Sequence, residues 1–234
     1  MNTDSVVLQV QDIHFGYDPG QNLINIDNFT ICKGESIFLR GPSGSGKSTL
    51  LGLIGGVLTP DKGSVAICGQ DITNISAGRR DQIRADHLGI IFQQFNLLPY
   101  LSVVQNCTLP CRFSAIRKQR AIEMNGTVAK AAQVLVTDLG LSEEHLSRPV
   151  GELSVGQQQR VAVARALIGG PDLIIADEPT SALDHDNRDR FIELLNSQRE
   201  AFGSSLLFVS HDNTLASHFD RAESLTDLNQ RAAA

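Results

Sequence analysis

The segment GPSGSGKS at residues 41–48 constrains the fold of this chain more than any other part of the sequence. It follows a short apolar stretch, SIFLR at 36–40, and precedes STLLGLIGG at 48–56, a helix-forming pattern that ends in two glycines. Glycines let successive backbone N–H groups turn toward one point without Cβ clashes. A strand, a glycine-rich loop and a helix in this order predict a phosphate-binding loop in an α/β domain.

The loop also predicts what its residues contact. Backbone N–H groups wrap a polyphosphate, and the positive end of the following helix adds to the attraction. We expect Lys47 to bridge β- and γ-phosphate oxygens, and the Ser48 hydroxyl to ligate Mg²⁺. The residues predicted to contact the nucleotide here are Gly41, Pro42, Ser43, Gly44, Ser45, Gly46, Lys47, Ser48 and Thr49.

A second segment, LIIADEP at 173–179, predicts the acidic partners of this loop. Its apolar part is typical of a buried strand, which brings Asp177 to the carboxyl edge of the sheet, beside the phosphate site. We expect Asp177 to hold Mg²⁺, directly or through water. Glu178 comes next and is predicted to polarise a water that attacks the γ-phosphate.

The distribution of apolar residues indicates an α/β core. Residues 173–177 and 205–210 are continuous apolar runs, as in the central strands of a parallel sheet, and a predicted helix over 188–202 joins them. Another buried strand is predicted at 89–92. The first third of the chain favours half-buried antiparallel strands at 6–15 and 23–31, and another strand is predicted at 64–69.

Helical patterns dominate between these two strand-rich parts. Ser102 and Ser142 are predicted N-caps, and an alanine-rich helix is expected over 121–140. We therefore predict a single domain over 1–234. Within it, 94–159 forms an inserted helical subdomain, and 1–93 with 160–234 forms the α/β core with its antiparallel β part.

Charge and composition narrow the function classes. The net charge of the 234 residues is −6, and the most basic run, RFSAIRKQR at 112–120, is interpreted as a solvated helix face, so we expect no nucleic-acid partner. No apolar run reaches the roughly 20 residues that span a bilayer. We expect a cytoplasmic protein with reduced cysteines, since the four cysteines form no CxxC pair, and Cys107 and Cys111 lack further metal ligands nearby.

A second possible anion site lies far along the chain, in LSVGQQQR at 153–160. Ser154 and Gly156 stand where a turn opens into a helix, and a helix N-terminus attracts anions. Since the chain already has a phosphate loop, residues alone do not explain a second phosphate-binding helix start.

The loop, the LSVGQ turn, LIIADEPTSALD and a strand ending in SHD together resemble the nucleotide-binding subunit of ABC (ATP-binding cassette) proteins. The resemblance covers nearly the whole chain. It implies a P-loop NTPase with a RecA-like core, an antiparallel β subdomain and an inserted α-helical subdomain. It also implies ATP and Mg²⁺ as cofactors and a head-to-tail dimer, in which Ser154, Gly156 and Gln157 meet the nucleotide of the second copy.

The same resemblance implies further site residues. Tyr17 matches the aromatic residue that stacks on adenine, and Gln93 matches a glutamine near Mg²⁺ and the attacking water, although Gln94 is adjacent. Asp184 matches a loop that crosses the dimer interface. His211 matches the histidine that contacts the γ-phosphate and orients the catalytic glutamate.

One position departs from the family pattern. The usual signature is LSGGQ, and Val155 replaces a glycine there. A β-branched residue is strained at positive φ. Either Val155 has ordinary dihedral angles or the site is altered. The resemblance implies that the site is functional.

The stretch RRDQIRADHLGIIFQQFNLLPYLSVVQNCTLP at 79–110 resembles the branch of lipoprotein-release and macrolide-export ATPases, LolD, MacB and FtsE. That branch implies an FtsX-like permease on another chain, which would hold this subunit at the inner face of the membrane. Three alternatives remain: the ATPase of a solute importer such as an amino-acid system, a soluble ATPase acting on nucleic acid, and an ATP-sensing module.

Overall fold

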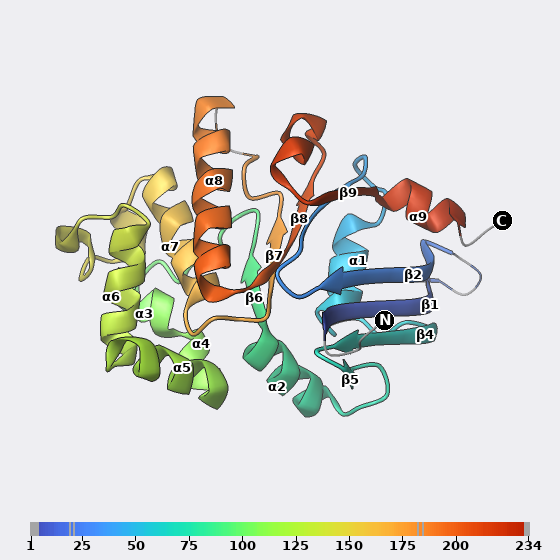
Figure 1. Ribbon diagram of the computed structural model, residues 1–234, viewed down its shortest axis with the longest axis horizontal. Coiled ribbons are helices and arrows are strands. Elements are labelled where there is room, and N and C mark those ends of the chain that lie inside the picture. The colour runs from blue at the N-terminus through green and yellow to red at the C-terminus, as the bar shows by residue number, and fades with distance from the viewer. Residues whose placement is uncertain (1–4, 19, 21, 182, 184, 232–234) are drawn as a thin grey trace.

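The computed structural model describes residues 5–18, 20, 22–181, 183 and 185–231, and Figure 1 shows its elements. A five-stranded sheet runs through the centre in the order β6-β7-β8-β3-β9, and every pair in it is parallel. The strands are β6 (Leu88–Ile91), β7 (Leu173–Asp177), β8 (Ser205–Ser210), β3 (Ser36–Arg40) and β9 (Arg221–Ser224). The continuous apolar runs thus form central strands, as predicted.

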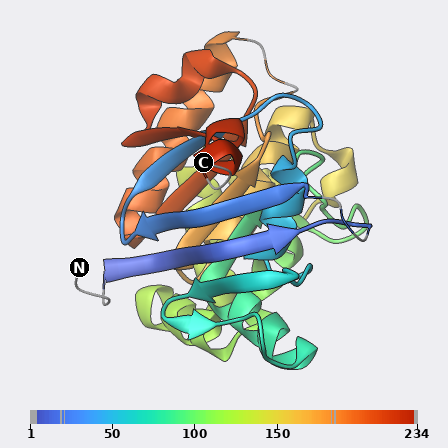
Figure 2. The same ribbon diagram turned by 90° about the vertical axis from the view of Figure 1, so that its right-hand side faces the viewer.

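A second, antiparallel sheet has the order β2-β1-β4-β5 and lies at the opposite side of the molecule from the helices α3–α6 (Figures 1 and 2). Its strands are β2 (Ile24–Cys32), β1 (Val6–Phe15), β4 (Lys62–Ile67) and β5 (Gln70–Asp71). Side chains along β1 and β2 alternate in part between buried and exposed, which confirms the half-buried antiparallel prediction.

The helices fall into two groups. Those against the two sheets are α1 (Lys47–Ile54), α2 (Ala77–His87), α7 (Val155–Leu167), α8 (His185–Phe202) and α9 (Leu225–Arg231). The remaining helices are α3 (Val103–Thr108), α4 (Pro110–Phe113), α5 (Ala115–Asn125) and α6 (Val128–Asp138), with 3₁₀ turns η2 (Glu143–His145), η3 (Val150–Glu152) and η4 (Asn213–His218). The elements that the sequence did not predict include α2, β5, β9, α9 and η4.

The predicted helix over 121–140 is wrong in its continuity. Gly126 has φ 80°, which ends α5, and Thr127 accepts a hydrogen bond from Lys130 N that caps α6. Glycine adopts this left-handed conformation readily and so ends a helix, and the Thr127 hydrogen bond stabilises the start of the next one. Ser102 caps α3 with a capping box, as predicted, whereas Ser142 makes no capping hydrogen bond to η2.

Two apolar cores lie on the two faces of the central sheet. Alternate residues of β3 point into different cores. Phe38 joins the core formed with α7 and α8, while Ile37 and Leu39 join the core formed with α1 and the antiparallel sheet. In β7, Ile174 and Ile175 divide in the same way. This follows from the period of two along a strand.

The basic run 112–120 is not a uniformly solvated face, because Arg117 is only 2% exposed. Its guanidinium donates to the carbonyls of Ile168, Leu88 and Ala166 at 2.8, 3.1 and 2.7 Å. Arg117 therefore fastens α5 to the end of α7 and the start of β6. Burial lowers its pKa to about 10. Among the described residues, no helix combines the length and apolar character needed to cross a membrane.

Candidate functional site

The residues predicted to bind phosphate and Mg²⁺ and to activate water converge at one edge of the central sheet. Because β3, β6, β7 and β8 are parallel, the segments that follow them all emerge at the same edge. These segments border a pocket of about 750 Å³. Its lining residues are Leu23, Pro42, Ser43, Gly44, Gly46, Lys47, Ser48, Thr49, Gln93, Asp177, Glu178 and His211.

The glycine-rich loop needs its glycines for two different reasons. Gly44 and Gly46 have φ 79° and 95°, values that residues with a Cβ rarely adopt. A Cβ on Gly41 would lie 2.5 Å from Ser45 Oγ, and one on Gly46 would lie 2.8 Å from Ile24 Cδ1. The loop is therefore a narrow backbone turn at the start of α1, which suits a bound phosphate.

Three charged or titratable side chains meet at the pocket. Lys47 Nζ lies 3.6 Å from Glu178 Oε1 and donates to the carbonyls of Gly41 and Pro42 at 2.7 and 3.1 Å. His211 Nδ1 lies 2.7 Å from Glu178 Oε2. Glu178 is therefore held from two sides, by a cation on the loop and by a ring on the segment after β8.

The backbone fixes the direction of Glu178 as well. Its φ is 45°, in the left-handed region, and its N–H donates to Val209 O at 2.9 Å. A non-glycine residue in this conformation costs on the order of 1 kcal/mol and persists where surrounding contacts define it. The turn separates the Glu178 side chain from that of Asp177, which completes β7.

Burial and neighbouring charges change the pKa of one acidic side chain in the pocket. Burial and then the neighbouring Glu178 carboxylate raise the pKa of Asp177, while Lys47 opposes the rise. Two adjacent carboxylates and one lysine leave a local need for positive charge. A divalent cation would meet that need.

Tyr17 lies beside the glycine-rich loop through its contact with Thr49, and Gln93 lines the pocket itself. Tyr17 is 62% exposed, its hydroxyl lies 3.3 Å from Thr49 Oγ1, and its ring meets Phe15 edge-on at 5.1 Å. A face of this ring thus remains open beside the loop. Gln93 lines the pocket, whereas Gln94 is not among the lining residues.

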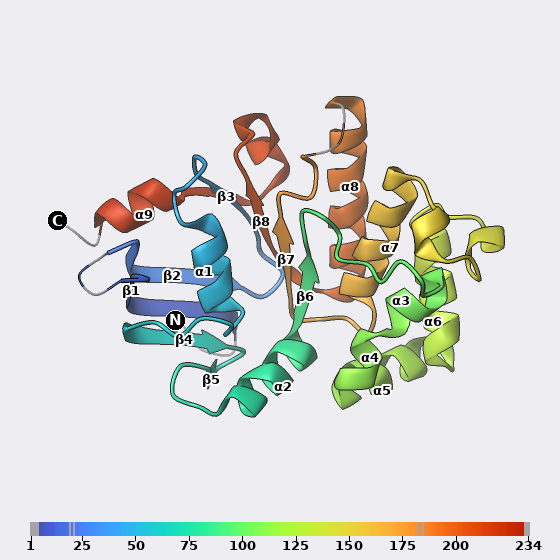
Figure 3. The same cartoon turned by 180° about the vertical axis from the view of Figure 1, so that it is seen from behind.

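The LSVGQ turn does not join this pocket. Ser154 caps α7 by a capping box with Gln157, and neither these residues nor Gly156 line the pocket. Figures 1 and 3 show α7 and α1 on opposite sides of β6 and β7. Val155 begins α7, is 54% exposed and is not among the described residues with positive φ, so it has ordinary dihedral angles.

Sequence reasoning missed several residues around the site. Leu23 lines the pocket, and Gln159 is 3% exposed and donates to Pro179 O at 2.9 Å. Arg188 contacts Leu183 O in the loop before α8 and Asp212 in the loop after β8. Asp184, predicted for the dimer interface, lies outside the described residues.

Comparison with known proteins decides the family. The profile described as "ABC transporter" matches residues 24–181, which contain the loop, the signature turn and the acidic pair. The chain belongs to the ABC transporter family. Its fold is that of an ABC ATPase, a P-loop NTPase with mixed α/β sheets, as the sequence predicted.

This ABC transporter chain is similar to both stand-alone and fused relatives. It is 37% identical over 229 residues to the lipoprotein-releasing system ATP-binding protein LolD of Shewanella frigidimarina, covering 96% of this chain and 92% of the relative. It is 38% identical over 200 residues to the macrolide export ATP-binding/permease protein MacB of Pasteurella multocida, covering 86% of this chain but only 29% of that relative.

A solved structure agrees with these relatives. The post-hydrolysis dimer of the ATP-binding cassette MJ0796, bound to ADP and Pi, superposes with a TM-score of 0.78 at 33% identity and covers 93% of each chain. The ABC transporter chain is therefore an ATP-binding ATPase subunit of the LolD and MacB type. The solute-importer alternative is not favoured.

Proposed function

We propose that this chain hydrolyses ATP with Lys47, Glu178 and His211 as its reaction centre and thereby powers a separate FtsX-like membrane permease. The observation that carries the assignment of roles is the pair of contacts on Glu178, 3.6 Å from Lys47 Nζ and 2.7 Å from His211 Nδ1. A carboxylate held in this way at the pocket can accept a proton from water without first reorienting.

Each group has a distinct task in this proposal. Lys47 and the N–H groups at the start of α1 bind the β- and γ-phosphates and neutralise their charge. Glu178 accepts a proton from the water that attacks the γ-phosphate. His211 holds the Glu178 carboxylate and contacts the γ-phosphate, and Tyr17 stacks on adenine.

The donor set at the pocket fits Mg²⁺. The Ser48 hydroxyl, the Asp177 carboxylate and the Gln93 amide offer oxygen atoms, which this hard cation prefers, and the two adjacent carboxylates call for positive charge. When bound, Mg²⁺ supplies charge stabilisation for the transferring phosphoryl group.

The position of the LSVGQ turn supports a dimer. Ser154, Gly156 and Gln157 lie at the start of α7, away from the pocket of their own chain. A helix N-terminus at that place becomes useful if it binds the nucleotide of a second copy, and Asp184 would lie at the same interface. The dimeric form of MJ0796 supports this assembly.

The helical part, 94–159, is proposed as the subdomain that transmits closure to the permease, with 1–93 and 160–234 as the ATP-binding core. The names of LolD and MacB, which concern a lipoprotein-releasing system and a macrolide export permease, support a permease partner. That partner would place the chain at the cytoplasmic face of a membrane. No nucleic-acid partner is proposed.

The variant Glu178→Gln tests the reaction centre. We expect ATP turnover to fall by at least about 100-fold, the usual scale for a positioned base, with ATP still bound. Glu123→Gln changes an exposed carboxylate on α5 and is the matched control. Undiminished turnover of Glu178→Gln would remove Glu178 from this role. Co-purification with an FtsX-like permease tests the partner separately.

A further inference from the structure

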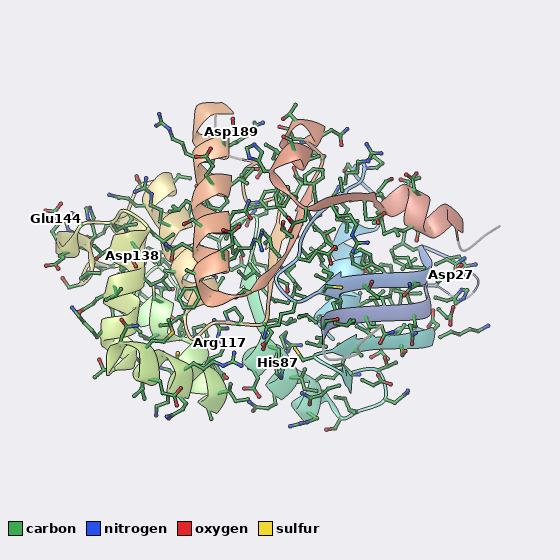
Figure 4. The ribbon with its side chains drawn as sticks, in the orientation of Figure 1. Asp27, His87, Arg117, Asp138, Glu144 and Asp189 are labelled. Atoms are coloured by element: carbon green, nitrogen blue, oxygen red, sulfur yellow. The ribbon has the colours of Figure 1, made fainter. Side chains whose placement is uncertain are left out.

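Three potential metal ligands meet at the edge of the sheet opposite the nucleotide pocket. Leu88 of β6 pairs with Leu173 of β7, so the residues just before them, His87 and Asp172, lie side by side at the amino ends of these strands. Cys68, in the turn between β4 and β5, completes the group. Figure 4 labels His87 near the lower end of β6.

The geometry of this group suits one small ion. The thiol sulfur of Cys68, a ring nitrogen of His87 and a carboxylate oxygen of Asp172 all lie within 4.8 Å of one another. Each residue is half-buried, so water can reach the group. Three donors from three separate segments converge here without any role in the nucleotide pocket.

Existing contacts orient the imidazole. His87 Nδ1 lies 2.7 Å from Asp172 Oδ2, and His87 Nε2 lies 3.3 Å from Gln70 Nε2. Hydrogen bonds with the side chains of Asp172 and then Cys68 raise the pKa of His87 to about 9, against the effect of burial. The hydrogen bond with Asp172 already turns the imidazole toward the carboxylate, as a shared metal ion would require.

Neighbouring positive charges limit the affinity of this group for a metal ion. Arg120 Nη1 lies 3.8 Å from Asp172 Oδ2, and Lys33 also acts on this carboxylate. Arg120 also donates to Gly170 O at 2.6 Å, and its side chain is 39% exposed. When a metal ion binds to Asp172, the Arg120 side chain can therefore move away from the carboxylate and keep its hydrogen bond to Gly170 O. The site is expected to bind more weakly than a closed site with four protein ligands.

We propose that Cys68, His87 and Asp172 form a binding site for Zn²⁺, with water as the fourth ligand. One sulfur, one imidazole nitrogen and one carboxylate oxygen are the ligand types that Zn²⁺ takes in tetrahedral sites, whereas Mg²⁺ prefers oxygen alone. The ion would connect the β4–β5 turn with the C-terminal end of α2 and with the residue that precedes β7. It would thereby link the antiparallel sheet to the central sheet.

Cobalt binding to the full-length, nucleotide-free protein tests this site. Co²⁺ substitutes for Zn²⁺ in such sites, and a cobalt–thiolate bond gives a near-ultraviolet charge-transfer band. We expect this band in the wild type, its displacement by Zn²⁺, and its loss in Cys68→Ser. Cys32→Ser removes an exposed thiol elsewhere and should leave the band unchanged. Asp172→Asn and His87→Gln should each weaken cobalt binding by at least about 10-fold.

Thermal unfolding gives a second readout. Zinc at about 100 times its Kd should raise Tm by about 5–10 °C in the wild type and not in Cys68→Ser. ATP turnover in Mg²⁺ by each variant verifies that it has folded. Cobalt binding without a thiolate band, or a band that survives in Cys68→Ser, would overturn the proposal. If Cys68→Ser does not fold, an unchanged cobalt affinity of Asp172→Asn would overturn it instead.

Discussion

Arg188 donates from Nη1 to Asp212 Oδ2 at 2.7 Å and from Nε to Leu183 O at 2.9 Å. Leu183 directly precedes Asp184, and Asp212 directly follows His211. One guanidinium at the start of α8 therefore joins the loop predicted for the dimer interface to the loop that carries the proposed γ-phosphate contact.

The first prediction concerns this link. Arg188→Ala should lower kcat for ATP about 10-fold with little change in KM, because it loosens the position of His211 without touching the phosphate loop. Arg188→Lys keeps the positive charge but loses the planar guanidinium with its several N–H donors, so it should restore only part of the lost activity. Arg190→Ala changes an exposed arginine on the same helix and serves as the control. A rise in KM alone would contradict this positioning role.

Arg117 should be a main determinant of stability rather than of catalysis. Arg117→Met leaves the carbonyls of Ile168, Leu88 and Ala166 without their donor and should lower the free energy of unfolding by about 3 kcal/mol. Lys118→Ala, at the next and exposed position, should change it by less than about 0.5 kcal/mol. Urea denaturation of both variants measures the difference, and equal midpoints would refute it.

The two loop glycines should respond differently to alanine. Gly46→Ala combines a φ of 95° with a Cβ 2.8 Å from Ile24 Cδ1, whereas Gly44→Ala meets only the φ of 79°, with open space around its Cβ. Gly44→Ala should weaken ATP binding about 5–30-fold, on a strain of about 1–2 kcal/mol, and Gly46→Ala should weaken it more. Equilibrium titration with a fluorescent ATP analogue checks the order.

Ser154→Arg should separate binding from turnover. In the proposed dimer the arginine would clash at the nucleotide of the second copy, so turnover should fall by at least about 100-fold while the monomer binds ATP as before. Val155→Gly is the matched control, since Val155 is exposed and has ordinary dihedral angles, and turnover should stay within about two-fold. Lost ATP affinity in the Ser154→Arg monomer would argue against action in trans.

The ion pair of His87 and Asp172 predicts a pH dependence of stability when EDTA removes metals. The pKa of His87 in the folded chain, about 9, exceeds its ordinary value of 6.5. Its contribution is therefore fully present below about pH 6.5 and is lost as the pH rises to about 9. We expect a decline on the order of 1 kcal/mol, since solvent screens a half-buried pair. Asp172→Asn should flatten this part of the stability profile, and an equally steep decline in that variant would point to another group.

The sequence predicted well those features that depend on neighbours in the chain. The loop at 41–48, the capping serine Ser102 and the apolar strands all express local backbone and hydrophobic preferences. The edge shared by Asp177 and His211 followed from strand direction alone, because parallel strands end together.

Features that depend on distant partners escaped sequence reasoning. Arg117 carries no local sign of burial, since its acceptors lie at the end of α7 and the start of β6. Cys68, His87 and Asp172 likewise belong to three separate segments that only the pairing of β6 with β7 and the β4–β5 turn bring together. The positive φ of Glu178 has no residue-type signal, because glutamate seldom adopts it.

The alternation of β3 and β7 between two apolar cores has a consequence for evolution. Phe208 packs in one of these cores and Leu207 in the other, so a truncation to alanine at either position leaves the side-chain contacts of the opposite core in place. Substitutions that repack one core can therefore accumulate in evolution without a compensating change of side chains in the other core.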